Sequence, residues 1–356
     1  MGHGTETAIA GKGNDMAGKL KVGIIGAGMI SEEHLTNYSK DPRVEIAWIA
    51  DVIEEKAKAR AKEFKLPKAV ADYRKVLREV GAVSVCTPPA MHLQPAKDAA
   101  AAGKHVLCEK PMTMNAAQAK EMQAACAKAK VQLGICSARS NLVPEISIAT
   151  EYVKDGKLGR VYYARVTSFR RRGRPGLDFW PNVTWFLDMS KAGGGAIMDI
   201  GCYDIDLLLK VLGAPQPVAV SATCTTEIGS QRVPKGVVHD VEEHVTAFVR
   251  FEDGSSATFE TAWATNMDGN DFIVFGTMGG IRLRPLTYFG EEKGKTFDRK
   301  LDTKGIKLES MQSDFASACL GKKAEPSTPG HVGVKIMQII ESALKSAKTG
   351  KEVRIS

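Results

Sequence analysis

The pattern of apolar and polar positions changes once along the chain, near residue 140. Before that point, short apolar runs alternate with stretches whose apolar residues recur at helical spacing. Strands that alternate with helices are typical of a doubly wound parallel sheet. The predicted strands span 20–25, 44–50, 82–86, 105–108 and 131–137, and the predicted helices follow residue 31 and span 54–64, 73–79, 94–102 and 115–128.

After residue 140, longer segments alternate between apolar and polar residues, which is typical of strands with one buried face. Few helices interrupt them, so this part is predicted to be an α+β unit on a mainly antiparallel sheet. The predicted strands span 161–169, 217–225, 243–251, 256–264 and 272–276, and the predicted helices span 145–154, 196–212 and 331–348.

Composition narrows the class of protein. The 356 residues are 44% hydrophobic and 25% charged, which is ordinary for a globular chain of two domains. The net charge is +8, but Lys and Arg are interleaved with Glu and no nucleic-acid-binding motif accompanies them, so we expect no nucleic-acid partner. No apolar run reaches the length of a membrane span, so no membrane association is predicted. Residues 1–18 lack the apolar core of a secretory signal and are predicted to be a flexible leader.

The seven cysteines are odd in number and form no C-x-x-C pair. This indicates a reducing compartment, the cytoplasm, without disulfides. No zinc-type spacing is present, so no metal site is predicted.

The sequence GAGMIS at 26–31 lies between the first predicted strand and the first predicted helix. Gly26 permits a tight turn, and Gly28 lets the backbone approach a pyrophosphate. The free N–H groups at the start of that helix would then face the phosphates. This context predicts a dinucleotide site.

Asp51 ends the second predicted strand, 23 residues after Gly28. A carboxylate at this spacing accepts hydrogen bonds from the adenosine ribose and repels a 2′-phosphate, which favours NAD over NADP. The alternative is that Asp51 caps the helix predicted at 54–64.

The predicted strand 105–108 ends at Glu109, Lys110 and Pro111. Ligands of open α/β sheets bind at the carboxyl ends of strands, so Glu109 and Lys110 are candidate site residues. The alternative is a solvated Glu-Lys pair before a helix.

A second candidate cluster is GGGAIMDIGCYDID at 193–206. The three glycines allow a close approach to the start of a helix. Asp199 and Tyr203 are spaced i, i+4 and are expected on one face, and Gly201 within the helix suggests a close neighbour. Alternatively, Asp199 binds backbone N–H groups and Tyr203 is a core aromatic.

These stretches, together with TPPAMH at 87–92 and AGKHVLCEKP at 102–111, resemble the Gfo/Idh/MocA family of glucose–fructose oxidoreductases and inositol dehydrogenases. The resemblance covers residues 20–355. It implies a Rossmann domain at 19–139 and, at 140–356, a substrate-binding and oligomerisation domain on a large open-faced sheet. It also implies NAD or NADP, a sugar, cyclitol or related polyol as substrate, and a homodimer or homotetramer.

The resemblance implies roles for individual residues. Lys110 matches the family's active-site lysine and Asp199 its substrate-binding acid. Tyr203 stands where many members have His, as it does in glucose–fructose oxidoreductases and dihydrodiol dehydrogenases, while Pro89 replaces a common Asn. The expected cofactor contacts are Gly26, Gly28, Met29, Ile30, Asp51, Thr87, Pro88, His92, Glu109, Lys110 and Arg139, and the expected substrate contacts are Lys110, Trp185, Asp199 and Tyr203.

These roles predict hydride transfer between the nicotinamide and a carbinol carbon, with Tyr203 as base and Lys110 lowering its pKa. Asp199 would hold the substrate hydroxyl and orient Lys110. An NAD-dependent glycosidase of the same fold and a regulatory protein that kept the nucleotide fold are the rival functions.

Three local features keep two interpretations each. His92 is either a cofactor or substrate contact or a core histidine. The aromatic residues Phe179, Trp180 and Trp185 either stack on a sugar or pack as core. The arginines at 170, 171, 172 and 174 form either a solvated loop or a clamp for an acidic substrate or a partner subunit.

Overall fold

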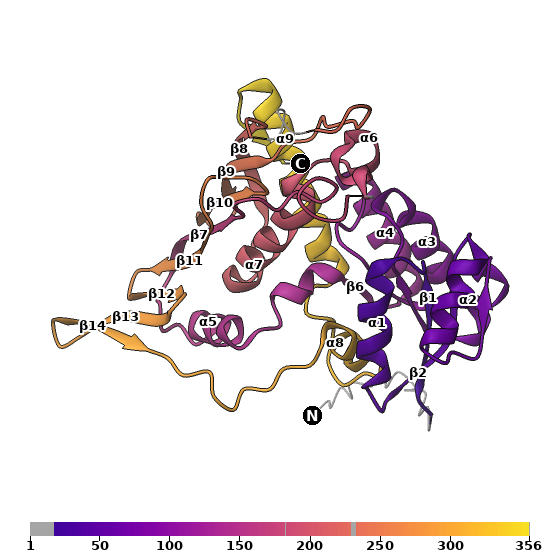
Figure 1. The fold of residues 1–356 in the computed structure, drawn as a ribbon. Helices are drawn as coiled ribbons and strands as arrows, with labels where there is room; N and C mark the ends of the chain where they lie inside the picture. The colour runs from indigo at the N-terminus through magenta and orange to yellow at the C-terminus, as the bar shows by residue number, and fades with distance from the viewer. Residues whose placement is uncertain (1–17, 182, 229–232, 356) are drawn as a thin grey trace, which may run out of the picture.

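The computed structural model describes residues 18–181, 183–228 and 233–355. Within them the strands form two sheets, one in the indigo and purple part of the chain and one in the magenta and orange part (Figure 1). The predicted leader lies outside the described residues apart from Gly18.

The first sheet is parallel throughout and has the strand order β3-β2-β1-β4-β5-β6. This order is the one found in dinucleotide-binding doubly wound folds, so the predicted fold class is confirmed. Its strands are β1 (Leu20–Ile25), β2 (Val44–Ala50), β3 (Ala69–Val70), β4 (Ala82–Val85), β5 (His105–Cys108) and β6 (Leu133–Ile135). The helices between them are α1 (Met29–Ser39), α2 (Glu54–Glu63), α3 (Leu93–Ala101) and α4 (Ala116–Ala129).

The helix predicted at 73–79 is wrong. The segment instead forms two 3₁₀ turns, Tyr73–Lys75 and Leu77–Glu79, and the Asp72 side chain caps the first of them by accepting from the Arg74 N–H. Seven residues offer few i→i−4 hydrogen bonds to offset the cost of nucleating an α-helix. The strand predicted at 131–137 is also shorter, because a 3₁₀ turn begins at Cys136.

The second sheet has the order β14-β13-β12-β11-β7-β10-β9-β8-β15. Only β7 and β10 pair in parallel among these described strands, so the predicted mainly antiparallel sheet is confirmed. The sequence pattern missed β12 to β14. The strands are β7 (Val161–Phe169), β8 (Pro217–Thr225), β9 (His244–Phe251), β10 (Ser256–Ala262), β11 (Gly269–Gly276), β12 (Gly279–Leu283), β13 (Leu286–Glu292), β14 (Lys295–Lys300) and β15 (Val353–Arg354).

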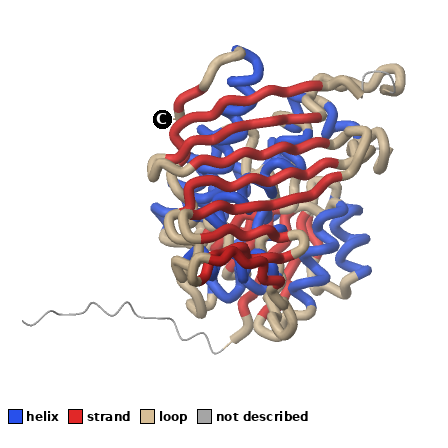
Figure 2. Tube along the Cα trace, turned by 90° about the vertical axis from the view of Figure 1, so that its left-hand side faces the viewer, coloured by secondary structure: helices blue, strands red, loops and turns tan. Residues whose placement is uncertain are grey.

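Helices cover one face of this sheet. Figure 2 shows the strands in front and helices behind them, with the near face free of described helices. The covering helices include α5 (Pro144–Lys154), α7 (Cys202–Leu212) and α9 (Gly330–Thr349), whose apolar sides join the largest core cluster. Since α9 also packs against α4, it connects the two sheets.

Two further elements bear on the site. The helix predicted at 196–212 is a π-helical turn, Ile197–Gly201, followed by α7. Before it lies α6 (Met189–Ala192). Late in the chain, α8 (Met311–Cys319) returns to the first sheet and packs beside α1, with Phe315 in the same apolar cluster as Leu35 (Figure 1).

Candidate active site

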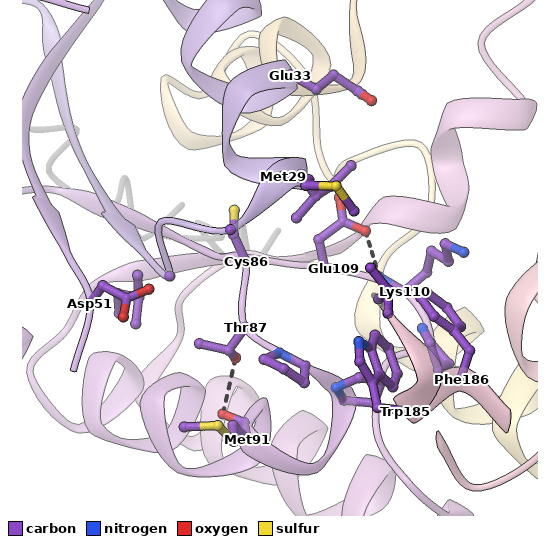
Figure 3. Close-up of a pocket in the computed structure, with 18 of the residues that line it drawn as sticks. Met29, Glu33, Asp51, Cys86, Thr87, Met91, Glu109, Lys110, Trp185 and Phe186 are labelled. Carbon is purple, nitrogen blue, oxygen red and sulfur yellow. Dashed lines mark hydrogen bonds between the residues drawn. The ribbon is translucent and has the colours of Figure 1, made fainter. Parts of the chain in front are cut away.

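A cavity of about 1090 Å³ extends from the glycine turn after β1 to the π-helical turn before α7. Figure 3 shows Asp51 toward one end and Lys110, Trp185 and Phe186 toward the other. The candidate residues that line it are Gly26, Gly28, Met29, Ile30, Asp51, Thr87, Pro88, Glu109, Lys110, Arg139, Trp185, Asp199 and Tyr203.

His92 is the candidate that does not line this cavity. Its Nδ1 lies 3.0 Å from the Pro111 carbonyl oxygen, and its Nε2 lies 2.7 Å from that of Thr87. The ring is fully buried, and burial lowers its pKa. His92 therefore holds the loops after β4 and β5 together as a core histidine, and the interpretation as a cofactor contact is corrected.

The glycine turn fits a dinucleotide. Gly26 has φ +101°, and an added Cβ there would lie 2.8 Å from the Cys86 carbonyl carbon, so only glycine fits between β1 and β4. An added Cβ on Gly28 would meet no atom within 4 Å, which leaves its face open to a ligand. No side chain among the described residues caps the start of α1 at Met29, so its first N–H groups can bind phosphate oxygens.

Asp51 faces the same turn. One carboxylate oxygen accepts from the Ala27 N–H at 2.9 Å and the other from the Ile53 N–H at 2.9 Å. It does not cap α2, since that helix begins at Glu54 with Ile53 as its cap residue. The carboxylate oxygens keep lone pairs for ribose hydroxyls. Lys56 also lines this part of the cavity.

At the other end, Lys110 and Asp199 form a mostly buried ion pair. The ammonium donates to Asp199 Oδ1 and to the Asp199 carbonyl oxygen, both at 2.8 Å. Trp263, which sequence patterns did not single out, donates from its indole N–H to Asp199 Oδ2 at 2.9 Å. Burial acts to lower the pKa of Lys110, but the Asp199 carboxylate acts to raise it and has the larger effect together with its neighbours. The net pKa therefore lies above its ordinary value, and Lys110 is an ammonium. The pair is not the solvated Glu-Lys step of the alternative interpretation.

Tyr203 is within reach of two cations. The Lys110 ammonium lies 4.8 Å from the centroid of the Tyr203 ring, over its face. The Tyr203 hydroxyl oxygen accepts a 2.6 Å hydrogen bond from Arg139 Nη1. Burial raises the pKa of Tyr203 above its ordinary value, although Lys110 and Arg139 both act to lower it. The prediction that Lys110 lowers the pKa of Tyr203 is right for the contribution of Lys110 itself. It is wrong for the net pKa, which burial raises. The cation that contacts the Tyr203 hydroxyl is Arg139.

Arg139 is held by two carboxylates. It donates from Nη2 to Glu109 Oε1 at 2.8 Å and from Nε to Glu33 at 2.8 Å. The same Glu109 oxygen lies 2.9 Å from His34 Nε2. Burial alone would raise the pKa of Glu109, but Arg139 and His34 bring it well below its usual range.

The cluster of His34, Glu109 and Cys136 has its donor atoms within 4.8 Å of one another, as a metal site would. However, Glu109 Oε1 already accepts from Arg139 and His34. The cluster is thus a buried hydrogen-bond network that orients Arg139.

The glycine triplet at 193–195 is contacted by Glu242 of the same protein. Glu242 accepts from the N–H groups of Gly195 and Ile197 at 2.8 and 3.0 Å, and an added Cβ on Gly195 would lie 2.0 Å from the Glu242 carbonyl oxygen. The three atoms nearest to a Cβ added at Gly201 belong to Ile197 and Ala196, at 3.1 to 3.6 Å.

The arginine run is divided between core and surface. Arg174 is only 1% exposed and pairs with Asp178 and Glu243, so the solvated-loop interpretation is wrong for it. Arg171 and Arg172 are exposed. Arg170 points to the site, with Nη1 3.8 Å from Asp199 Oδ2.

Aromatic side chains form one wall of the cavity. Trp185 stacks on Phe186 with ring centroids 3.9 Å apart, and the two rings lie beside Lys110 (Figure 3). Trp180, which is 49% exposed, also lines the cavity.

The fold and the site define a class of protein. A parallel sheet with an open glycine turn and an acid at the next strand end, facing a lysine and a tyrosine across one cavity, is the arrangement of a nicotinamide-dependent oxidoreductase. The chain matches two family models, the oxidoreductase family with NAD-binding Rossmann fold at residues 20–136 and the GFO/IDH/MocA C-terminal domain at 146–282. It belongs to the Gfo/Idh/MocA family of oxidoreductases, as the resemblance predicted.

Named relatives support this membership. The chain is 28% identical to the D-glucoside 3-dehydrogenase of Escherichia coli (strain K12) over 94% of its own length and 97% of the relative's. It is 30% identical to the levoglucosan dehydrogenase of Pseudarthrobacter phenanthrenivorans over 74% of its length and 73% of the relative's. A solved levoglucosan dehydrogenase in complex with NADH and levoglucosan shares the fold, with TM-score 0.81 and 24% identity over 95% of this chain and 99% of that one.

Proposed function

We propose that this protein transfers a hydride between a nicotinamide cofactor, NAD in preference to NADP, and a carbinol carbon of a sugar, cyclitol or related polyol. The observation that carries this proposal is the meeting of Lys110, Asp199 and Tyr203 in one cavity with the glycine turn and Asp51. The sugar dehydrogenases among the relatives support the substrate class.

Residues of the first sheet would hold the cofactor. The start of α1 behind Gly28 would bind the pyrophosphate and Asp51 the adenosine ribose, leaving the nicotinamide near Glu109 and Lys110. The cofactor supplies the site that accepts or gives the hydride. The carboxylate of Asp51 supports NAD, because it would repel a 2′-phosphate.

The protein's own residues move the proton. When a carbinol is oxidised, its hydroxyl proton must leave as the hydride departs. Tyr203 takes that proton, and the fixed positive charge of Arg139 at its hydroxyl stabilises the tyrosinate. Lys110, held by Asp199, donates to the carbinol oxygen and stabilises the negative charge that develops there.

The part of the cavity proposed to bind the substrate is partly apolar. Trp185 and Phe186 form a flat wall beside Lys110, which suits the C–H face of a sugar ring.

A panel of sugars, cyclitols and sugar acids with NAD and with NADP tests this function, with absorbance at about 340 nm as the readout. We expect net NADH formation with at least one polyol and a higher kcat/KM with NAD than with NADP. Cleavage of a glycoside without net NADH would instead establish the transient-oxidation glycosidase. NAD binding with no turnover of any polyol would support the regulatory alternative.

We further propose that the chain is cytoplasmic and assembles as a homodimer or homotetramer through the helix-free face of the large sheet. Tyr163 and Phe275 stack on that face with ring centroids 5.9 Å apart, while their neighbours Ala164 and Val274 are buried on the opposite face. Seven free thiols support a reducing compartment. No helix in the described ranges is long and apolar enough to span a bilayer. Light scattering after size-exclusion chromatography measures the assembly, and a monomeric mass would refute it.

A further inference from the structure

A second cavity of about 750 Å³ adjoins the first and shares Arg139 and Tyr203 with it. It lies between the helix-covered face of the large sheet and the helices α5 and α7, which lie on one side of the sheet in Figure 1. Val166 and Phe272 line it from the sheet, and Ile146 and Leu207 line it from the helices. A substrate oxidised next to Tyr203 therefore has room to extend into this second cavity.

Sheet topology brings two arginines to its rim. The strands β7 and β12 run in the same direction, since each is antiparallel to β11 between them. Arg170 directly follows β7 and Arg284 directly follows β12, so both stand near the same edge of the sheet. The register through β11 brings Arg284 level with Thr167, so the two arginines are separated by two strand spacings of ~4.8 Å across the sheet and by about three residues along it. Arg170 shares the side of β7 that carries Val166 and Ser168, and both arginines line the cavity.

The acids around this cavity already have hydrogen-bond donors. Asp204 accepts from the hydroxyls of Ser168 and Thr261, at 2.7 and 2.5 Å. Asp199 accepts from Lys110 and Trp263. Burial raises the pKa of Asp204 to about 6, so Asp204 is still mostly ionised at pH 7, and the charges of Arg170 and Arg284 both act to lower that pKa. One oxygen of Asp268, which also lines the cavity, accepts from the Arg171 N–H.

The Arg170 and Arg284 side chains, in contrast, have N–H donors without hydrogen-bond partners among the described residues. Within the described residues, the one ion pair of the Arg170 side chain is the 3.8 Å contact to Asp199, which is too long for a hydrogen bond, and its charge also acts on Asp204. The exposed Arg284 side chain has no hydrogen bond or ion pair within the described ranges. Each guanidinium carries five N–H donors in a planar fork that matches a carboxylate or a phosphate. The N–H donors of Arg170 and Arg284 that lack hydrogen-bond partners in the second cavity are thus suited to bind an anion.

We propose that the second cavity binds an anionic oxygen group of the substrate between Arg170 and Arg284, which makes the substrate an acidic sugar. The proposal rests on the proposed function for the reaction and names the substrate class of the same site. The shared chemistry is that of a carboxylate, as in a uronate or an aldonate, or of a phosphate ester. Because Arg170 also lies against Asp199, it connects the anion to the residue that holds Lys110.

The test compares matched substrates and matched variants. The substrates are D-glucose, D-glucuronate, D-gluconate and D-glucose 6-phosphate, each with NAD, and the readout is the ratio of kcat/KM for each acid to that for glucose. The variants are Arg170→Met, Arg284→Met and, as control, Arg282→Met. Arg282 is the same residue type two positions away, pairs with Asp271 and does not line the cavity.

We expect an acid to be preferred by the unmodified enzyme, and either cavity variant to lower the ratio by about 10- to 100-fold, the range of a charge-assisted hydrogen bond. Arg282→Met should leave the ratio unchanged. Whether uronate, aldonate or phosphate responds identifies the source of the anion. A preference for glucose, or an equal loss on glucose and acids, overturns the proposal while leaving the dehydrogenase intact.

Calorimetric titration of D-glucuronate and D-glucose 6-phosphate separates this proposal from the proposed function. Binding that Arg284→Met weakens about tenfold or more, in a protein that turns over none of the substrates, would keep the anion site and refute the dehydrogenase. Turnover of neutral polyols without measurable binding of either acid would do the reverse. The anion's contribution should also weaken with added salt, since Arg284 is exposed.

Discussion

The hydrogen bond from Arg139 to Tyr203 makes the sharpest prediction, because it joins a permanent cation to the proposed base. Arg139→Met removes the only charged donor at the Tyr203 hydroxyl among the described residues and leaves Lys110 over the ring face. A hydrogen bond to a charged group contributes about 1.5–3 kcal/mol, and one pKa unit corresponds to about 1.36 kcal/mol. The pKa of Tyr203 should therefore rise by a further ~1–2 units.

The sign of the pH effect follows from the role of a base. Oxidation of a carbinol needs Tyr203 without its proton, so kcat/KM rises with pH until Tyr203 is ionised. Arg139→Met should move this rise to higher pH by the same ~1–2 units and lower kcat/KM about 10- to 100-fold at pH below it. The measurement is the pH profile of kcat/KM for polyol oxidation.

Two variants serve as controls for this profile. Arg139→Lys should recover part of the shift, since a point charge replaces one of the three contacts made by the guanidinium. Tyr203→Phe should abolish the rise with pH. Circular dichroism checks that the buried Glu109, which loses its ion pair with Arg139, has not unfolded the protein.

An unshifted profile in Arg139→Met together with a raised Kd for NAD would refute this reasoning. Arg139 would then act on the cofactor, as the family resemblance first suggested, and some other group would set the ionisation of Tyr203.

Three further predictions concern the rest of the site. Lys110→Ala should lower kcat at least about 100-fold with little change in the Kd for NAD, because Lys110 acts on charge that develops during the reaction; equal losses in both would point to a cofactor role. Asp51→Ser should raise the ratio of kcat/KM with NADP to that with NAD by about tenfold or more, since it removes the carboxylate opposite a 2′-phosphate; an unchanged ratio would exclude Asp51 as the ribose contact. Gly195→Ala should lower the Tm by several degrees, as its Cβ would lie 2.0 Å from the Glu242 carbonyl oxygen, whereas Gly28→Ala has open space and should weaken NAD binding with little effect on Tm; similar melting curves for the two variants would contradict this.

The sequence by itself determined the local elements and their chemical character. Strands 20–25, 44–50, 105–108, 161–169 and 217–225 have the predicted bounds, because apolar runs and alternation follow from which faces of a strand are buried. The glycine turn, Asp51 and Lys110 were also found from sequence, since each lies at the end of a strand where the chain must turn. Short elements such as β3 and the two 3₁₀ turns carried too little periodicity to be predicted.

Only the tertiary structure decided which side chains meet. Arg139 reaches the Tyr203 hydroxyl across 64 residues of chain, and Trp263 reaches Asp199 across another 64. Arg170 and Arg284 line one cavity because β11 lies between β7 and β12, an order that the local pattern does not contain. His92 was assigned to the core by carbonyl groups from two loops. Periodicity reports the face on which a residue lies, whereas the identity of its partner depends on how distant segments pack.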